Sequence, residues 1–529
     1  TNLIRLITRL MFVWFLKEKG LVPEDLFDKE KLKRIVKDFG KGNNYYNAIL
    51  QNLFFAVLNQ KIEDRRFAKD DGFFANRSEY GVKTLLRYKD KFLISEEEVL
   101  ELFGQIPFIN GGLFDCLDKE DENGRVIYVD GFSRNPEKQA KVPDYLFFQE
   151  KEERVDLSKY GLGKREPVRG LIEILKSYNF TVDEATPIDQ EIALDPEMLG
   201  KVFENLLAAY VPETAETARK ATGSYYTPRE IVDYMVDESL KEYFKTHSKL
   251  TEEQIEKLLS YTEDAPELTE DQRHEIIELI DRLKVLDPAC GSGAFPMGIL
   301  HKLVHILQKI DPNNELWYET QYQRAIKESE EAFKKLELDK SEREEILKEI
   351  NESFDESLNY PDYARKLYLI ENCIYGVDIQ PIAVQISKLR FFISLLIDQK
   401  VDKSKENFGI RPLPNLETNF VAANTLIGLE GNNHIWRTQE IKDLEEQIKR
   451  VRHRYFNAKT RKQKLELQKK DKELREKLKE KLEKAKLPAE TAEKIAKFDP
   501  YDQNASSDWF DPEWMFGVTD GFDIVIGNP

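Results

Sequence analysis

The residues best suited to chemistry lie in one short stretch, Val285–Phe295, which reads VLDPACGSGAF. An apolar run ends at Asp287, glycines follow at 291 and 293, and an apolar helical pattern continues to Leu307. A strand, a tight glycine-rich turn and a helix in this order open a nucleotide-binding βαβ unit. Glycine lets backbone N–H groups approach a ligand, and the start of the next helix favours a carboxylate or another anion. A plain strand-to-helix loop is the alternative, and the signals elsewhere in the chain argue against it.

An acidic residue follows a second strand pattern. Residues 373–378, CIYGVD, form an apolar run that ends at Asp378. A carboxylate at the tip of the second strand can accept both hydroxyl hydrogens of a ribose, usually about 20 residues after the glycine-rich turn. Here the separation from Asp287 is 378 − 287 = 91 residues, and a helical insertion explains the excess. Ile379 could pack on an adenine face; a surface acid with no ligand is the alternative for Asp378.

Two further strand patterns complete the set. Residues 419–428, NFVAANTLIG, predict a third strand with Asn424 just beyond it. That side chain either binds a purine edge or caps a turn. Residues 521–529, GFDIVIGNP, predict a strand over 522–526. This strand would deliver Asn528 and Pro529 to the carboxyl edge of the sheet, where open α/β sheets bind ligands.

A helix start precedes the first strand of the sheet. In residues 222–235, TGSYYTPREIVDYM, Thr227 is a good N-cap, Pro228 is the favoured first helical residue, and Glu230 completes a capping box. Tyr225 and Tyr226 precede the cap and could close over a ligand. A well-capped helix without a ligand is the alternative.

Composition limits the class of protein. The chain has 529 residues, a formal net charge of −18, 41% hydrophobic residues and 34% charged residues. This charge argues against a compact cationic module that coats nucleic acid by charge alone, but a basic cleft on an acidic body stays possible. No apolar run is long enough to span a bilayer and there is no signal peptide, so we expect a cytoplasmic protein without a membrane partner.

The three cysteines, at positions 116, 290 and 373, have no CxxC spacing, so we expect neither a metal site nor a disulfide framework. Cys290 is interpreted as a packed side chain rather than a nucleophile, because no basic or histidine neighbour flanks it. The pairs Pro143-Asp144 and Glu150-Lys151 lack the spacing of a nuclease metal site, which needs two hard-metal carboxylates and a lysine.

The hydrophobic periodicity predicts two domains. Residues 1–215 form a mainly helical N-terminal domain, expected to be a scaffold. Residues 216–529 form an α/β domain with a doubly wound, mostly parallel, Rossmann-like sheet and helical insertions at 247–282, 311–365 and 438–498. The last insertion is dense in Lys, Glu and Arg and predicts a long exposed helix or an antiparallel helix pair. A solvated arm is favoured over a contact with the DNA backbone.

Taken in order, TGSYYTP, DPACGSGAF, GVD and Asn528-Pro529 resemble the motifs of class I S-adenosylmethionine-dependent N6-adenine DNA methyltransferases. The likeness is strongest to the methylase region of type IIG restriction–modification enzymes and their phage-exclusion relatives. It covers residues 222–529 by motif and residues 1–220 more loosely, through PFINGGLFD and LGKVFENLL. The NPPY motif is present only as Asn528-Pro529, so we expect its second proline and aromatic residue to follow Pro529.

The resemblance implies S-adenosylmethionine as cofactor and assigns functions to single residues. Asp287 and the glycine turn would hold its methionine end, Asp378 its ribose and Asn424 its adenine, with Tyr226 and Thr227 closing the far side. Asn528 and Pro529 would be catalytic, accepting the two hydrogens of the adenine amino group. The full set of cofactor candidates is Tyr226, Thr227, Asp287, Pro288, Ala289, Gly291, Gly293, Phe295, Asp378, Ile379 and Asn424.

The implied partner is double-stranded DNA with the target adenine flipped out. A DNA-specificity domain is expected after Pro529, and a nuclease, if one exists, before Thr1. Because the chain would lack part of its NPPY motif, we expect this fragment to bind cofactor but to methylate DNA poorly. A methyltransferase acting on protein glutamine or RNA, which can share the NPPY-type turn, is one alternative. A subunit that binds cofactor and DNA without turnover is another.

Overall fold

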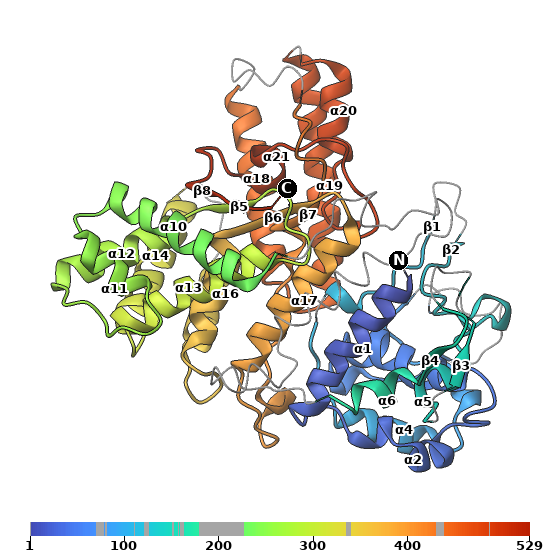
Figure 1. Ribbon diagram of the computed structural model, residues 1–529. Helices are drawn as coiled ribbons and strands as arrows, with labels where there is room; N and C mark the ends of the chain where they lie inside the picture. Colours follow the sequence, from blue (N-terminus) through green and yellow to red (C-terminus); the bar gives the residue numbers. More distant parts are fainter. Residues whose placement is uncertain are drawn as a thin grey trace. The chain divides into compact units, whose positions relative to one another are not determined.

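The computed structural model describes residues 2–69, 79, 82–110, 112–120, 126–150, 153–156, 158, 163–178, 227–334, 340–429, 438–485 and 487–528. The chain forms two compact units, which are coloured along the sequence in Figure 1. The N-terminal unit comprises Thr1–Tyr225, Val401–Pro414 and Lys459–Arg461. The sheet unit comprises Tyr226–Lys400, Asn415–Ala458 and Lys462–Pro529.

The described part of the N-terminal unit consists of helices around an aromatic core, with two small antiparallel strand pairs, β1–β2 and β3–β4. Helix α1 (Asn2–Glu18) buries Phe12, Trp14 and Phe15. Its other helices and strands are α2 (Lys29–Ile35), a π-helix (Tyr46–Val57), α4 (Glu96–Gly104), β1 (Lys119–Glu120), β2 (Val126–Ile127), α5 (Tyr145–Phe148), β3 (Glu153–Val155), β4 (Glu166–Val168) and α6 (Leu171–Leu175). Short 3₁₀ helices cover Glu24–Phe27, Ile62–Asp64, Lys89–Lys91, Gly112–Phe114, Pro136–Lys138 and Glu406–Gly409.

Charged groups inside this unit hold its loops together. Arg9 Nη1 lies 2.6 Å from Asp130 Oδ1, and both side chains are buried. Asp144 accepts hydrogen bonds from the backbone N–H groups of Gly40 and Tyr45, at 2.9 and 3.0 Å. The Asp144 carboxylate therefore fixes the backbone of the segment that contains Gly40 and Tyr45.

Four parallel strands organise the sheet unit, in the order β7–β6–β5–β8. They are β5 (Val285–Asp287), β6 (Ile374–Asp378), β7 (Phe420–Ala422) and β8 (Ile524–Val525). Val285 pairs with Ile374 on one side and with Ile524 on the other. Numbered from β5 along the chain, the strands lie in the order 3-2-1-4, as in doubly wound nucleotide-binding sheets. The predicted α/β class and parallel sheet are confirmed.

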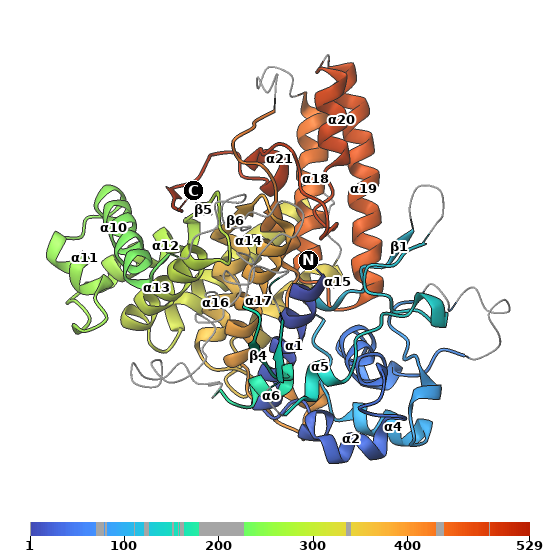
Figure 2. The same ribbon diagram turned by 45° about the vertical axis from the view of Figure 1, so that its right-hand side comes forward.

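Helices cover both faces of this sheet (Figures 1 and 2). Successive residues of a strand point to opposite faces. Phe420 of β7 lies against Phe391 of α17, with ring centroids 4.8 Å apart, and Val421 packs into a cluster with α18 and α19. The first face carries α13 (Ala294–Ile310), α16 (Asp362–Asn372) and α17 (Pro381–Ile397), and the second carries α18 (Gln439–Phe456), α19 (Arg461–Lys484), α20 (Ala489–Lys497) and α21 (Pro512–Phe516).

The remaining helices extend the first layer. Before β5 come α10 (Arg229–His247), α11 (Glu252–Leu259) and α12 (Glu270–Arg282); α14 (Glu315–Lys334) and α15 (Lys340–Ser353) lie between α13 and α16, and a 3₁₀ helix covers Leu416–Thr418. Thr251 and Thr269 start α11 and α12 with capping boxes. Among the described helices, none combines the length and apolar composition that crossing a bilayer requires.

Candidate functional site

The carboxyl ends of the parallel strands bring four loops to one edge of the sheet. These loops are Pro288–Gly293 after β5, Ile379–Gln380 after β6, Ala423–Ile427 after β7 and Ile526–Asn528 after β8. The strand order reverses between β5 and β8. Ligands of open α/β sheets bind at such a switch point, so the chemistry of this edge depends on which side chains the loops carry.

Asp287 occupies the end of the central strand and is only 2% exposed. Its Oδ1 accepts a hydrogen bond from the backbone N–H of Ala289 at 3.0 Å. Its Oδ2 is buried and has no hydrogen-bond partner within the described ranges. Burial raises the pKa of Asp287 to about 8; the Ala289 N–H lowers it and the Asp378 charge raises it. A buried carboxyl with one unsatisfied oxygen is suited to a ligand that brings a hydrogen-bond donor or a positive charge.

The loop after β8 passes directly over Asp287. A Cβ atom on Gly527 would lie 2.7 Å from Asp287 Oδ1 and 3.4 Å from Pro288 Cδ. Any other residue at this position would push the two loops apart. Glycine therefore brings the backbone before Asn528 to the end of β5.

Asp378 links the loop after β6 to the glycine-rich turn. Its Oδ2 accepts a hydrogen bond from Gly291 N at 3.0 Å, and its Oδ1 accepts one from Gln380 N at 2.7 Å. Burial raises the pKa of Asp378, and these two N–H groups lower it. Each carboxylate oxygen can accept more than one hydrogen bond, so capacity for hydroxyl donors is left. Ile379 follows with 55% of its surface exposed, as an apolar contact to a ring would require.

The two glycines of the turn are needed for different reasons. Gly291 and Gly293 both have positive φ, +52° and +85°, which favours glycine. A Cβ on Gly291 would meet nothing within 4 Å, whereas one on Gly293 would collide with Ser387 Oγ of α17. The space that a side chain at position 293 would need is thus filled by Ser387 of α17. Phe295, two residues later, is 3% exposed and belongs to the core.

The loop after β7 is fixed on both sides. Thr425 Oγ1 donates a hydrogen bond to the carbonyl oxygen of Pro288 at 3.1 Å. Asn424 Oδ1 accepts one from Leu426 N at 3.1 Å, so Asn424 caps a turn, and its contact with a purine edge stays a prediction. The contact between Thr425 and Pro288 could not be predicted from the sequence, because neither residue is part of a periodic pattern that could relate them.

The capping box predicted at Thr227 is wrong. Pro228 has an extended ψ of 145° and is itself the N-cap, so α10 starts at Arg229, and no side chain caps it. Thr227 Oγ1 instead accepts a hydrogen bond from Asn528 Nδ2 at 3.3 Å. The two predicted site residues are therefore brought together. Tyr226 and Pro529 lie outside the described residues.

Cys290 is packed, as expected. It is 4% exposed, and burial raises the pKa of its thiol well above the ordinary value. A thiol held neutral in this way is a poor nucleophile.

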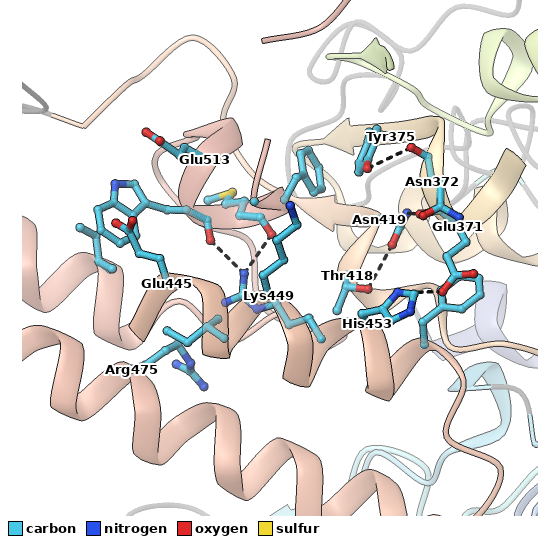
Figure 3. A pocket seen from close by; sticks show the side chains of 18 of the residues that line it. Glu371, Asn372, Tyr375, Thr418, Asn419, Glu445, Lys449, His453, Arg475 and Glu513 are labelled. Carbon is cyan, nitrogen blue, oxygen red and sulfur yellow. Dashed lines mark hydrogen bonds and ion pairs between the residues drawn. The ribbon is translucent and has the colours of Figure 1, made fainter. Parts of the chain in front are cut away.

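A cavity of about 130 Å³ lies elsewhere in the sheet unit, between the sheet and helices α18 and α21 (Figure 3). Its polar groups are largely engaged with each other. His453 Nδ1 lies 3.1 Å from Glu371 Oε1, and Arg452 Nη1 donates to the carbonyl oxygen of Trp514 at 2.9 Å. Of the described residues that line it, none is a predicted site residue. We therefore place the candidate site at the carboxyl edge of the sheet.

Comparison with known proteins agrees with the motifs. Residues 372–529, which include β6, β7 and β8, match the Eco57I restriction-modification methylase family. The chain is also similar to a candidate type II restriction enzyme and methyltransferase from Methanocaldococcus jannaschii, with 27% identity over 454 residues. This alignment covers 83% of the chain but only 28% of that relative, so the chain spans less than a third of its length. The predicted resemblance to restriction–modification methyltransferases is confirmed.

Proposed function

We propose that this chain carries the methylase activity of a restriction–modification enzyme, transferring a methyl group from S-adenosylmethionine to N6 of a specific adenine in DNA. The observation that carries the proposal is the meeting of Asp287, Asp378 and Asn528 at the carboxyl ends of three adjacent parallel strands. Similarity to restriction–modification methylases favours DNA over RNA or protein as the substrate.

The residues at this edge fit the cofactor. Oδ2 of Asp287 lacks a partner among the described residues and suits the cationic methionine end. Asp378 has acceptor capacity for ribose hydroxyls, and the exposed Ile379 offers an apolar surface to adenine. Bound S-adenosylmethionine supplies an electrophilic methyl group on a sulfonium centre.

Asn528 and Pro529 would prepare the nucleophile. The amino nitrogen of adenine is weakly nucleophilic because its lone pair is delocalised into the ring. The side-chain oxygen of Asn528 and the carbonyl oxygen of Pro529 would each accept a hydrogen bond from one N–H of this amino group. These two bonds would draw the nitrogen towards tetrahedral geometry. Positioning then provides most of the rate gain, and no general base of low pKa is required. The adenine must leave the duplex, which costs about a few kcal/mol of unstacking.

The test uses the full-length protein with methyl-labelled S-adenosylmethionine and three substrates: duplex DNA, RNA and a protein extract. We expect label in DNA, recovered as N6-methyladenine by mass spectrometry of the nucleosides. Asn528→Ala should abolish transfer and leave cofactor affinity within about threefold, because Asn528 acts on the substrate base. Label in RNA, in protein or on cytosine would refute the proposal. Binding of cofactor and DNA without any transfer would favour a non-catalytic subunit.

We propose that base recognition is carried by chain beyond Pro529, and any nuclease by chain before Thr1, in line with the much greater length of the Methanocaldococcus relative. Swapping the segment after Pro529 with that of a related enzyme should change the methylated sequence and leave the methylated atom the same.

A further inference from the structure

The contact between Thr227 and Asn528 joins residues 301 positions apart. Thr227 is 8% exposed and precedes α10, which packs on α13 of the sheet layer. Pro228 follows it with its φ restricted by the ring, at −56°. The hydroxyl of Thr227 therefore belongs to a well-supported part of the protein, whereas the side chain of Asn528 is exposed. The supported residue can orient the exposed one.

Orientation matters because the two ends of an asparagine amide have opposite hydrogen-bonding character. Only Oδ1 can accept a hydrogen from an amino group, and a half-turn about the terminal torsion would present Nδ2, which can only donate. In this structure Nδ2 points at Thr227 Oγ1, 3.3 Å away. That bond directs Oδ1 to the other side of the amide.

We propose that Thr227 is a positioning residue: its Oγ1 accepts a hydrogen bond from Asn528 Nδ2 and so holds the amide with Oδ1 facing the amino group of the substrate base, whereas a flipped amide would set Nδ2 against the N–H groups of that base. The inference rests on the proposed function, since it assigns a purpose to Asn528 during methyl transfer. It also changes the assignment made from the sequence, in which Thr227 closes over the cofactor.

The two assignments of Thr227 predict different kinetics. A residue that contacts the cofactor supports its binding, so its loss raises KM for S-adenosylmethionine. A residue that orients Asn528 acts on the methyl-transfer step, so its loss lowers kcat with cofactor affinity little changed. Two nearly isosteric variants isolate the hydroxyl: Thr227→Val keeps the shape without it, and Thr227→Ser keeps it without the methyl group.

The experiment measures kcat, KM and cofactor affinity for the full-length wild-type protein and both variants on duplex DNA. We expect Thr227→Val to lower kcat roughly fivefold to tenfold, the range of one neutral hydrogen bond, and Thr227→Ser to stay within about twofold of wild type. Melting temperatures report whether each variant folds. If Thr227→Val has no cooperative transition, Thr227→Ala is the second variant that lacks the hydroxyl.

Asn528→Asp supplies the sharper control, because both ends of a carboxylate are acceptors and no orientation has to be selected. We expect Thr227→Val to lower kcat in the Asn528 background and to have an effect of less than about twofold in the Asn528→Asp background. If Thr227→Val lowered kcat by the same factor in both backgrounds, the inference would be overturned. A rise in KM for the cofactor at unchanged kcat would overturn it as well. If the Asn528→Asp protein transfers too little methyl group for kcat values to be compared, the kcat values of Thr227→Val and Thr227→Ser in the wild-type background decide whether the inference stands.

Failure of this inference differs visibly from failure of the proposed function. If wild-type protein transfers no methyl group to any DNA, both the proposed function and the inference about Thr227 fail. If wild type methylates adenine and Thr227→Val matches it in kcat, the function stands and only the positioning function of Thr227 is lost.

Discussion

The backbone N–H of Gly291 donates a hydrogen bond to the carboxylate of Asp378 at 3.0 Å, across 87 positions of sequence. The contact makes the glycine-rich turn and the loop after β6 one connected structure. A residue expected only to bind a ribose therefore also shapes the neighbouring loop.

Replacing Asp378 with alanine should both loosen this edge and weaken cofactor binding. The variant leaves the N–H groups of Gly291 and Gln380 without their acceptor, and such charge-assisted bonds each contribute about 1.5–3 kcal/mol. We expect at least about a tenfold loss of S-adenosylmethionine affinity in calorimetric titration. Asp520→Ala, which changes an exposed aspartate before β8, should leave the affinity unaltered. Equal affinities for the two variants would show that Asp378 does not hold the site.

Gly527→Ala tests the close approach of the β8 loop to β5. The added methyl group would lie 2.7 Å from Asp287 Oδ1, a contact that real Cβ atoms do not make. Because Asp287 is buried and bonded to Ala289, we expect a loss of about 1–3 kcal/mol in the free energy of unfolding, typical of overpacking, and weaker cofactor binding. Gly428→Ala, where a Cβ meets nothing within 4 Å, is the matched control in thermal denaturation. An unchanged melting temperature for Gly527→Ala would contradict the geometry.

The pKa of Asp287 makes the stability of the ligand-free protein depend on pH. Its value of about 8 in the folded chain exceeds the ordinary value of about 4 in the unfolded chain. Between these values the native state holds a proton that the unfolded state has lost, so this group's contribution to stability falls as pH rises from about 4 to about 8. Asp287→Asn should remove that dependence and be more stable than wild type near pH 8 in urea titrations.

The same carboxyl should give cofactor binding the opposite dependence on pH. A positively charged ligand prefers the ionised form, so the affinity of wild type for S-adenosylmethionine should rise from about pH 6 to about pH 8 and then level off, with protons released on binding. Asp287→Asn should bind more weakly, with a flat profile. A flat profile for wild type would mean that Asp287 is not the group facing the positive charge.

A buried aspartate should hold the four helices of the second layer together. Asp471 of α19 is fully buried between Arg452 Nε at 3.1 Å and Arg475 Nε at 2.7 Å. These arginines also bond to carbonyl oxygens of Met515 and Ala496, in α21 and α20. Asp471→Asn should cost about 3–5 kcal/mol in the free energy of unfolding, because two buried cations lose their counter-charge.

The control for Asp471 is an exposed ion pair on the same helix. Lys462 and Glu466 lie 4.0 Å apart, with side chains 86% and 65% exposed. Glu466→Gln should leave the urea midpoint nearly unchanged, since solvent screens such pairs. A similar midpoint for both variants would show that burial of the Asp471 carboxylate is not what stabilises these helices.

The local pattern of residues was sufficient to predict those parts of the site that are contiguous in sequence. The strand before Asp287, the turn with Gly291 and Gly293 and the strand ending at Asp378 could all be predicted, because apolar runs followed by glycine or an acid have few structural alternatives. The parallel orientation of the strands was expected from the same motifs, whereas their order in the sheet comes from the structure. Each of these predictions concerned one element and its immediate flanks.

Contacts between distant elements could not be predicted in this way. The bond from Asn528 to Thr227 depends on the extended conformation of Pro228, because of which α10 begins at Arg229, one residue later than predicted. Gly293 was predicted to lie against the cofactor, and the structure adds a packing reason for this glycine, because a Cβ there would collide with Ser387 on a helix that starts at Pro381. Both relationships arise from how helices pack on the sheet, and a single sequence carries no periodic signal for that.

The central position of β5 has a consequence for biosynthesis. Its first neighbour, Ile374, leaves the ribosome 374 − 285 = 89 residues after Val285, but its second, Ile524, follows only after 524 − 285 = 239 residues. Throughout that interval one edge of the nascent strand has no partner, and open edges invite pairing with other chains. The carboxyl edge of the sheet is therefore completed around β5 only after β8 has been synthesised, and a chain stalled between these two strands would leave that edge of β5 open for longest.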